Sequence, residues 1–426
     1  MKVKIGLLLC LLLLSDFVRS QDIEYAKSIV STLASPEMKG RGYVQNGDQL
    51  AAQFIKTEFE KIGLKKFKND YFQKYTTSVN SFPGQMKVLV NGNLLIPGKD
   101  FLIDDGSPSV SGKFSTVNLS PADILNRDRL IKSLKDSKGK FIVIESYDAT
   151  NYSKEENESL TELINYIKYH PDNLSAGSVI LSKGKLTWGG STEQNKRPSF
   201  TIKVDSSALP VSELEFKVDA LFLPKHKSQN VVGYLEGERT DSTIVLVAHY
   251  DHLGMMGSDT YFPGANDNAS GVAMLLSLAR HFSVEKPRFN TVFIAFGSEE
   301  IGLIGAKYFV ENPLIDLTKI KFLLNFDISG TGDDGIQIVN GSVYQDKFDL
   351  LSGINTEQSL LKEVKIRGEA CNSDHCMFHL KKVPCFFIYT LGGIQAYHDI
   401  YDKSETLPLT EFEDYFKLLT LFIQKI

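Results

Sequence analysis

Hydrophobic runs of strand length alternate with helix-like segments in the C-terminal half of this 426-residue chain. The runs are rich in Val, Ile and Phe, as buried strands are. They are Ser242–Ala248, Thr291–Phe296, Lys321–Phe326 and Cys385–Tyr389. Alternation of this kind is typical of α/β proteins, because parallel strands need long, usually helical, crossovers. The sequence therefore predicts a three-layer α/β/α sandwich around a mostly parallel mixed sheet.

Four further segments carry apolar residues at helical spacing, so that one face of each would pack on a core. They are Gly47–Ile62, Ser270–Phe282, Ile304–Asn312 and Thr410–Ile423. Gly63 follows the first of them and Pro313 the third, and both residue types commonly end helices. With 42% hydrophobic residues, the chain has enough apolar content for a large core.

Histidine and acidic residues come soon after the predicted strands. His249 follows the first strand, Glu299 and Glu300 the second, Asp327 the third, and His398 the fourth after one loop. Ligands of open α/β sheets bind beyond the carboxyl ends of the strands, so we expect these side chains at one rim. Crowded carboxylates repel each other and are costly to bury unless a positive charge lies among them. A metal site, with two ions, is the simplest arrangement.

Asp267 lies in the segment Gly264–Gly271, which reads GANDNASG and precedes a predicted helix. Mixed imidazole and carboxylate ligation suits zinc, and two zinc ions about 3.5–4 Å apart need a shared carboxylate. An aspartate before a helix is often only a cap. Here Asn268 and Ser270 can cap the helix, which makes Asp267 the best candidate for the bridge.

Three motifs resemble those of the co-catalytic zinc exopeptidases of clan MH, the superfamily of secreted leucyl-type aminopeptidases and glutamate carboxypeptidase II. They are HYD at His249–Asp251, the GANDNASG segment and the Glu299–Glu300 pair. The likeness is good over residues 230–426 and loose over residues 35–63. It implies a zinc exopeptidase, with an aminopeptidase as the leading expectation, in which a metal-activated water attacks the peptide bond.

The resemblance also implies a role for each matching residue. His249 and Asp327 would hold one Zn²⁺, Glu300 and His398 the other, Asp267 would bridge them, and Glu299 would be the general base. Asp251 matches a carboxylate that orients the ligand imidazole, and Tyr397 matches a tyrosine that stabilises the oxyanion in the carboxypeptidase branch. A cis peptide bond is expected at Asp267–Asn268. The remaining histidines His252, His375 and His379 are interpreted as structural, because five ligand positions are already filled. Asp374 is also interpreted as structural.

Other functions fit the same motifs. A glutaminyl cyclase of this fold uses a single zinc, and its branch also keeps the HYD triplet, so metal content separates the two readings. A carboxypeptidase or dipeptidase would share the whole site. A non-catalytic binding protein on this scaffold is disfavoured by the retention of all five ligands and the base. Specificity and oligomeric state are not indicated by the sequence.

Residues 76–227 lack the alternation of strands and helices seen after them. They are expected to form an inserted β-rich domain, similar to a protease-associated domain or a lid. Met86–Ile96 suggests a hairpin, Lys140–Ser146 a buried strand, and Ser175–Trp188 a strand, turn and strand. His170 is interpreted as a solvated surface residue. The expected division is a signal peptide (1–20), the start of the catalytic domain (21–75), the insert (76–227) and the rest of the catalytic domain (228–426).

The N-terminus has the pattern of a secretory signal. Lys2 and Lys4 precede an apolar run at Ile5–Leu14, and Val18–Ser20 offers a cleavage site. Export to the periplasm or medium is expected, with an uncleaved anchor or lipoprotein signal as the alternative. After cleavage no membrane span is expected. The net charge of −5 gives no basic footprint for nucleic acid, so the expected partner is a peptide substrate.

Removal of the signal leaves three cysteines, Cys371, Cys376 and Cys385. An odd number in an oxidising compartment permits one internal bridge and one spare thiol. Cys371 and Cys376 are the expected pair, since they lie close together around Ser373–His375. Three reduced, buried cysteines are the alternative.

Overall fold

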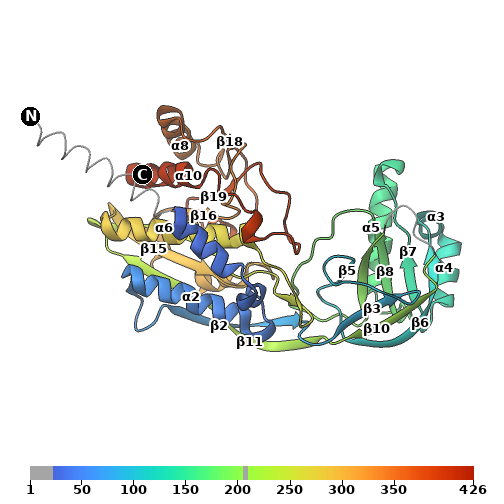
Figure 1. Ribbon diagram of the computed structural model, residues 1–426. Coiled ribbons are helices and arrows are strands. Elements are labelled where there is room, and N and C mark those ends of the chain that lie inside the picture. Colours follow the sequence, from blue (N-terminus) through green and yellow to red (C-terminus); the bar gives the residue numbers. More distant parts are fainter. Residues whose placement is uncertain (1–22, 205–209) are drawn as a thin grey trace, which may run out of the picture.

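The computed structural model describes residues 23–204 and 210–426, and Figure 1 shows them as two bodies, each built on its own sheet. The predicted signal peptide, residues 1–20, lies outside the described residues. Within the described part of the chain, no helix has both the length and the apolar character that a membrane crossing requires.

The first sheet has a parallel centre, as the sequence predicts. Strands β15, β12, β16 and β19 lie side by side and parallel, and antiparallel strands flank them on both sides. Among the described residues this sheet has nine strands: β1 (Lys65–Lys66), β2 (Phe72–Ser81), β11 (Leu221–Leu235), β12 (Arg239–His249), β15 (Phe289–Phe296), β16 (Ile320–Phe326), β17 (Ile336–Val339), β18 (Val364–Ile366) and β19 (Cys385–Thr390). The four predicted strands all form.

Helices cover both faces of this sheet, which confirms the three-layer arrangement, and Figure 1 labels the four that cover one of the faces. One face packs against α2 (Gly47–Ile62), α6 (Gly271–Val284), α8 (Gln345–Gln358) and α10 (Phe412–Lys425). The other face packs against α7 (Ile304–Glu311) and α9 (His375–His379). The predicted end of α2 is also confirmed, because Gly63 takes a left-handed φ of 85° and its N–H bonds to the carbonyls of Phe59 and Glu60.

The second sheet lies within residues 86–218 and is mixed. In the described chain its strands are β3 (Met86–Val90), β4 (Asn93–Leu94), β5 (Phe101–Ile103), β6 (Val110–Leu119), β7 (Phe141–Ile144), β8 (Gly177–Ser182), β9 (Ser199–Lys203) and β10 (Glu213–Val218). The hairpin of β3 and β4 and the buried strand β7 are confirmed. The expected strand, turn and strand at Ser175–Trp188 is wrong, since only β8 forms and its neighbours β7 and β9 run parallel to it.

Three helices pack on one face of the second sheet, where the sequence analysis expected mainly strands. They are α3 (Pro121–Leu125), α4 (Arg127–Asp136) and α5 (Lys154–Tyr169). The start of α5 was readable, because Ser153 and Glu156 form a capping box. The helices bury Ile142 and Ile144, which point to their side of the sheet. All four residues of β7 are buried, so the strand is apolar on both faces.

The two sheets are connected by chain and by packing. Strand β2 pairs over its whole length with the first part of β11, Leu221–Val231, and the two strands join the bodies in Figure 1. The open face of the second sheet buries Phe216 and its neighbours together with Leu253, Met256 and Phe262, which belong to the loop after β12. The loop that follows the first candidate ligand is therefore part of the core of the second sheet.

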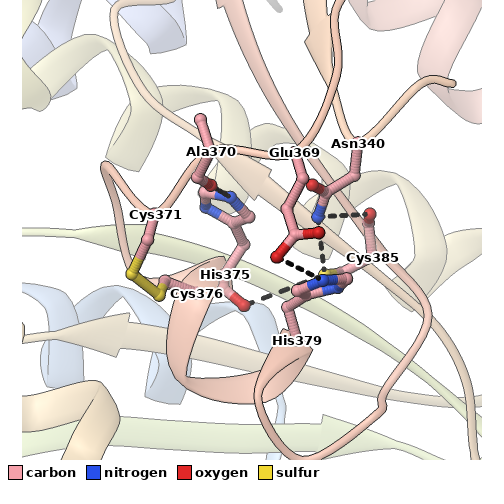
Figure 2. Close-up of a disulfide and its surroundings, with 8 residues drawn as sticks. All are labelled: Asn340, Glu369, Ala370, Cys371, His375, Cys376, His379 and Cys385. Atoms are coloured by element: carbon pink, nitrogen blue, oxygen red, sulfur yellow. Dashed lines mark hydrogen bonds and ion pairs between the residues drawn. A yellow bond between two sulfur atoms is a disulfide. The ribbon is translucent and has the colours of Figure 1, made fainter. Parts of the chain in front are cut away.

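A disulfide joins Cys371 to Cys376, the expected pair, beside α9 (Figure 2). Cys385 is a free, buried thiol on β19. The same view shows His375, whose Nε2 lies 2.8 Å from the carbonyl of Ala370, and His379, which pairs with Glu369 at 3.3 Å. These contacts fix the loop before β19.

Candidate metal centre

The candidate ligands converge at the carboxyl ends of the parallel strands. His249 is the last residue of β12, Asp327 follows β16 directly, and Glu299 and Glu300 follow β15 after two residues. His398 comes from the loop after β19. Asp267 lies in the turn η4 (Ala265–Ser270) that leads into α6. Since neighbouring parallel strands end at one edge, the topology alone brings these loops together.

A first group contains His249, Asp267 and Asp327, all of them buried. His249 Nε2 lies 3.4 Å from Asp267 Oδ1 and 3.3 Å from Asp327 Oδ2. Two ligand atoms that each lie about 2.0–2.1 Å from one tetrahedral zinc are about 3.4 Å apart. The three side chains thus have the spacing of ligands to a single ion.

A second group shares the same aspartate. His398 Nε2 lies 3.0 Å from Asp267 Oδ2 and 3.1 Å from Glu300 Oε2. Asp267 therefore directs Oδ1 to the first group and Oδ2 to the second. A carboxylate that divides its oxygens in this way is suited to bridge two ions.

His252 also faces the second group, although the sequence analysis set it aside. Its Nδ1 lies 2.7 Å from Glu300 Oε1, and its Nε2 is buried without a hydrogen-bond partner among the described residues. His252, Asp267 and Glu300 offer atoms close enough to share an ion. Its place directly after the HYD motif was no guide, because a fifth ligand had already been assigned to His398.

Adjacent glutamates have opposite electrostatic surroundings. Burial would raise the pKa of Glu300, but charge and hydrogen bonds from His398 and His252 outweigh it and lower that pKa to about 2. Burial raises the pKa of Glu299 well above its ordinary value, and the nearby carboxylates of Asp374 and Glu300 reinforce this shift. Glu300 is thus held ionised beside the histidines, whereas Glu299 binds a proton more readily. Such a difference in pKa suits Glu300 to metal binding and Glu299 to general acid–base catalysis.

Asp251 contacts the glutamate loop. Its Oδ1 accepts a hydrogen bond from Glu299 N at 3.0 Å, and its Oδ2 accepts one from Glu300 N at 3.3 Å. His249 Nδ1 lies 4.0 Å from this carboxylate and 3.2 Å from the main-chain carbonyl of Asp251. The His249 imidazole thus lies closer to the main-chain carbonyl of Asp251 than to the Asp251 carboxylate.

Two residues that hold the Asp267 loop were not predicted. Arg41 is fully buried and donates to five main-chain carbonyls, those of Leu33, Tyr250, Pro263, Gly264 and Asp267. Asp402 accepts hydrogen bonds from the N–H groups of Asn266 and Asp267. The Arg41 charge also offsets part of the negative charge of the rim, although all its hydrogen bonds go to carbonyls.

The Asp267–Asn268 peptide bond is cis, as the resemblance predicted. The Asn268 side chain accepts from Gly271 N at 2.9 Å, so it caps α6 as expected. Ser270 does not cap the helix, because its hydroxyl donates to the carbonyl of Asn266. Asp267 is consequently free of any capping role.

The other candidates lie at the edge of the site or behind it. Tyr397 is 44% exposed, and its ring stacks on the imidazole of His398 with centroids 4.0 Å apart. Asp374 is fully buried, and within the described residues neither of its carboxylate oxygens has a hydrogen-bond partner. Burial raises the pKa of Asp374 to about 8. His170 is partly exposed and lies 3.9 Å from Asp172 on the second sheet's side.

A small cavity of about 20 Å³ adjoins Glu300 and His252. Both sheets contribute to its wall, with Phe82, Asp105 and Trp188 from the second body and Leu253 and Ile301 from the first. A space of this size holds about one water molecule.

The donors fit zinc. Two imidazoles and three carboxylates are offered as two sets sharing one aspartate, and mixed nitrogen and oxygen ligation is usual for catalytic zinc. Asp327 Oδ1 is buried without a hydrogen-bond partner among the described residues, as an oxygen near a cation can be. Among the described residues, the buried Arg41 and the protonated His398 offset part of the charge of these carboxylates.

Residues 230–423 match the sequence profile of peptidase family M28. Aminopeptidase YwaD of Bacillus subtilis (strain 168) is 27% identical over 254 residues, which are 57% of this chain and 52% of that protein. A probable zinc metalloprotease of Pyricularia oryzae is 38% identical over 114 residues, 26% of this chain and 23% of that protein. The chain thus spans about half of the length of the first relative and about a quarter of that of the second. The predicted kinship with zinc exopeptidases is confirmed.

Solved structures are similar in fold. The zinc aminopeptidase BSAP from Bacillus subtilis superposes with a TM-score of 0.68 at 19% identity, over 94% of each chain. A peptidase M28 precursor from Shewanella amazonensis also gives 0.68, at 15% identity over 96% of each chain. Coverage this high includes the second sheet as well as the first. The predicted α/β class is confirmed.

Proposed function

We propose, from the peptidase family M28 match of residues 230–423 and the geometry of the rim, that this chain is an exported zinc-dependent exopeptidase that acts as an aminopeptidase. The observation that carries the proposal is the division of the Asp267 carboxylate between two groups of ligands. A structural zinc needs a closed set of four ligands, whereas three side chains per ion leave positions for substrate.

His249, Asp267 and Asp327 would hold one Zn²⁺, and Asp267, Glu300 and His398 the other. Zinc bound there would polarise the scissile carbonyl and activate water for attack. His252 would hold Glu300 in place through its 2.7 Å contact with Oε1, which leaves Oε2 directed to the ion.

Glu299 would be the general base. Its raised pKa favours taking a proton from the attacking water and then passing it to the leaving amine. Asp251 would set the direction of the Glu299 side chain through the main-chain hydrogen bond. Tyr397 stands beside His398, at the exposed side of the site, where its hydroxyl would stabilise the oxyanion of the intermediate.

Action at the amino end of peptides is supported by two of the similar proteins. YwaD and BSAP are both described as aminopeptidases. Short peptides are the proposed substrates, and the small cavity beside Glu300 and His252 is walled by both bodies. Export is supported by the sequence pattern of residues 1–20.

The test combines metal content with substrate choice. Purified protein should contain about two zinc per chain and release amino acids from peptides with a free amino end, but not from amino-blocked ones. Asp267→Ala should lose both ions and the activity, whereas the exposed control Asp259→Ala should keep both. One zinc per chain, or equal cleavage of blocked peptides, would contradict the proposal.

A further inference from the structure

A segment of the second body reaches into the metal centre. Residues Lys185–Gly190, here called the strap, lie between β8 and β9 and contact the loop that carries His398. Trp188 N donates to the carbonyl of His398 at 2.9 Å, and His398 Nδ1 lies 2.9 Å from the carbonyl oxygen of Trp188. The two residues are therefore joined by a reciprocal pair of hydrogen bonds.

Trp188 is itself fixed by the core of the second sheet. Its side chain is buried, and its Nε1 donates to the carbonyl of Ile103 at 2.7 Å. The indole ring lies 4.7 Å from the ring of Phe262 and 6.0 Å from that of Phe82. Packing of this kind leaves the Trp188 carbonyl little freedom to turn away from His398.

The ends of the strap hold the same region. Lys185 Nζ donates to the carbonyl of Gln395 at 2.7 Å and forms an ion pair with Asp399 at 2.9 Å. It therefore contacts the loop on both sides of His398. At the other end, Gly190 lies so close to Ile301 that an added Cβ would be 2.5 Å from its Cγ2. The strap thus lies against the neighbours of two proposed ligands, His398 and Glu300.

The hydrogen bond to Trp188 determines what His398 can offer. A main-chain carbonyl only accepts, so Nδ1 must carry the proton in this contact. The neutral imidazole then has its lone pair on Nε2, the atom that faces Asp267 and Glu300. Partners of this kind fix both the tautomer and the direction of a metal-binding histidine.

We infer that the second body positions His398 as a zinc ligand through the carbonyl of Trp188, so that Trp188 is a positioning residue. The inference rests on the proposed two-zinc function. His249, in contrast, has its Nδ1 against Asp251 O, within the first body. Disturbing the strap should therefore weaken the zinc held by His398 and Glu300 and spare the one held by His249 and Asp327.

The experiment measures zinc per chain in zinc-buffered solutions, by elemental analysis, with circular dichroism as the check on folding. Trp188→Ala should bind one of the two ions about 10–100-fold more weakly, the range seen when such partners of a ligand are lost. Trp188→Phe, which keeps a ring against Phe262, should regain most of that affinity. Lys185→Ala, an exposed change, should give a smaller loss of the same ion, and it decides the matter if Trp188→Ala does not fold.

Two further variants make the result specific. Phe216→Ala disturbs the core of the second sheet at the rings of Phe114, Phe141 and Phe200 and should keep both ions. His398→Ala should lose one ion, and adding Trp188→Ala to it should cause no further loss of the remaining one. The inference, but not the proposed function, would be overturned by wild-type zinc affinity in both Trp188→Ala and Lys185→Ala. Loss of the ion held by His249 in the double variant would overturn it too. Wild-type protein without zinc would overturn the proposed function and the inference with it.

Discussion

Asp251 Oδ1 accepts a hydrogen bond from the main-chain N–H of Glu299 at 3.0 Å. The other oxygen accepts from Glu300 N, and the same residue offers its carbonyl to His249 Nδ1. A single buried residue thus sets the position of the proposed base and of one ligand to each proposed ion. This gives Asp251 a wider role than the orientation of one imidazole.

Replacement of Asp251 by Asn should disturb its two contacts with the Glu299 and Glu300 N–H groups, while the main-chain carbonyl that faces His249 is kept. The amide keeps one acceptor oxygen and turns a donor NH₂ toward an N–H of the glutamate loop. We expect zinc affinity to fall about 10–100-fold, with a lower kcat in zinc-saturated enzyme. Zinc titration and kinetics at saturating zinc would measure the two effects. The exposed change Asp259→Asn is the control, and equal behaviour of the two variants would contradict the role.

Glu299→Gln should separate binding from chemistry. Glutamine has nearly the same shape but cannot take a proton, so kcat should fall about 10²–10⁴-fold while both zinc ions stay bound. Glu300→Gln should instead weaken zinc binding, because an amide is a poorer ligand than a carboxylate. Normal hydrolysis by Glu299→Gln would show that the base is misassigned. The exposed change Glu311→Gln serves as the control.

Zinc binding should release protons. Burial opposes protonation of His398, but Glu300 and Asp267 outweigh it and raise its pKa to about 11; the pKa of His249 is also raised. At neutral pH the His398 imidazole of the metal-free protein is protonated on both nitrogens and must lose the Nε2 proton to bind zinc, and the raised pKa of His249 acts in the same direction, so at least one proton is released. Calorimetry in buffers of different ionisation enthalpy would count them.

The sign of the pH dependence follows from the same shift. Apparent zinc affinity should increase as pH rises from 6 toward 9, since proton competition weakens. In the metal-free protein, His398 should stabilise the fold fully below the ordinary histidine pKa of about 6.5 and lose this contribution as pH rises through about 11. Zinc affinity that falls with rising pH in this window would contradict the protonated resting state.

Arg41→Ala should be strongly destabilising. It removes a buried charge that satisfies five carbonyls and leaves them without donors, a change expected to cost about 3–5 kcal/mol of unfolding free energy. Urea unfolding of the zinc-loaded protein would measure it. The exposed Arg127→Ala should change stability by less than about 0.5 kcal/mol. A similarly small effect at Arg41 would contradict its role in holding the Asp267 loop.

The parts of the fold that follow local rules were predictable. Apolar spacing and Gly63 placed α2 at Gly47–Ile62 with the observed bounds. Four of the five proposed ligands could be found because they lie at or after the ends of parallel strands, which meet at a shared edge. Asp267 was found from the GANDNASG segment that leads into α6. The resemblance added the cis peptide bond, and proximity in sequence suggested the Cys371–Cys376 pair.

Contacts between distant segments were not predictable. Arg41 meets Gly264 across 223 positions, and Trp188 meets His398 across 210. Neither has a periodic or motif-like signal, apart from the glycines around Arg41 that allow a close loop. His252 was set aside by counting ligands, a criterion that cannot detect a histidine that holds another ligand in place.

The central claim is that Asp267 bridges two zinc ions at the rim. Crystals of the zinc-loaded protein, measured on both sides of the zinc absorption edge, would test it most directly. We predict two anomalous peaks about 3.5–4 Å apart, one beside His249 and Asp327 and one beside Glu300 and His398. A single peak, or peaks that Asp267 does not touch, would contradict the account.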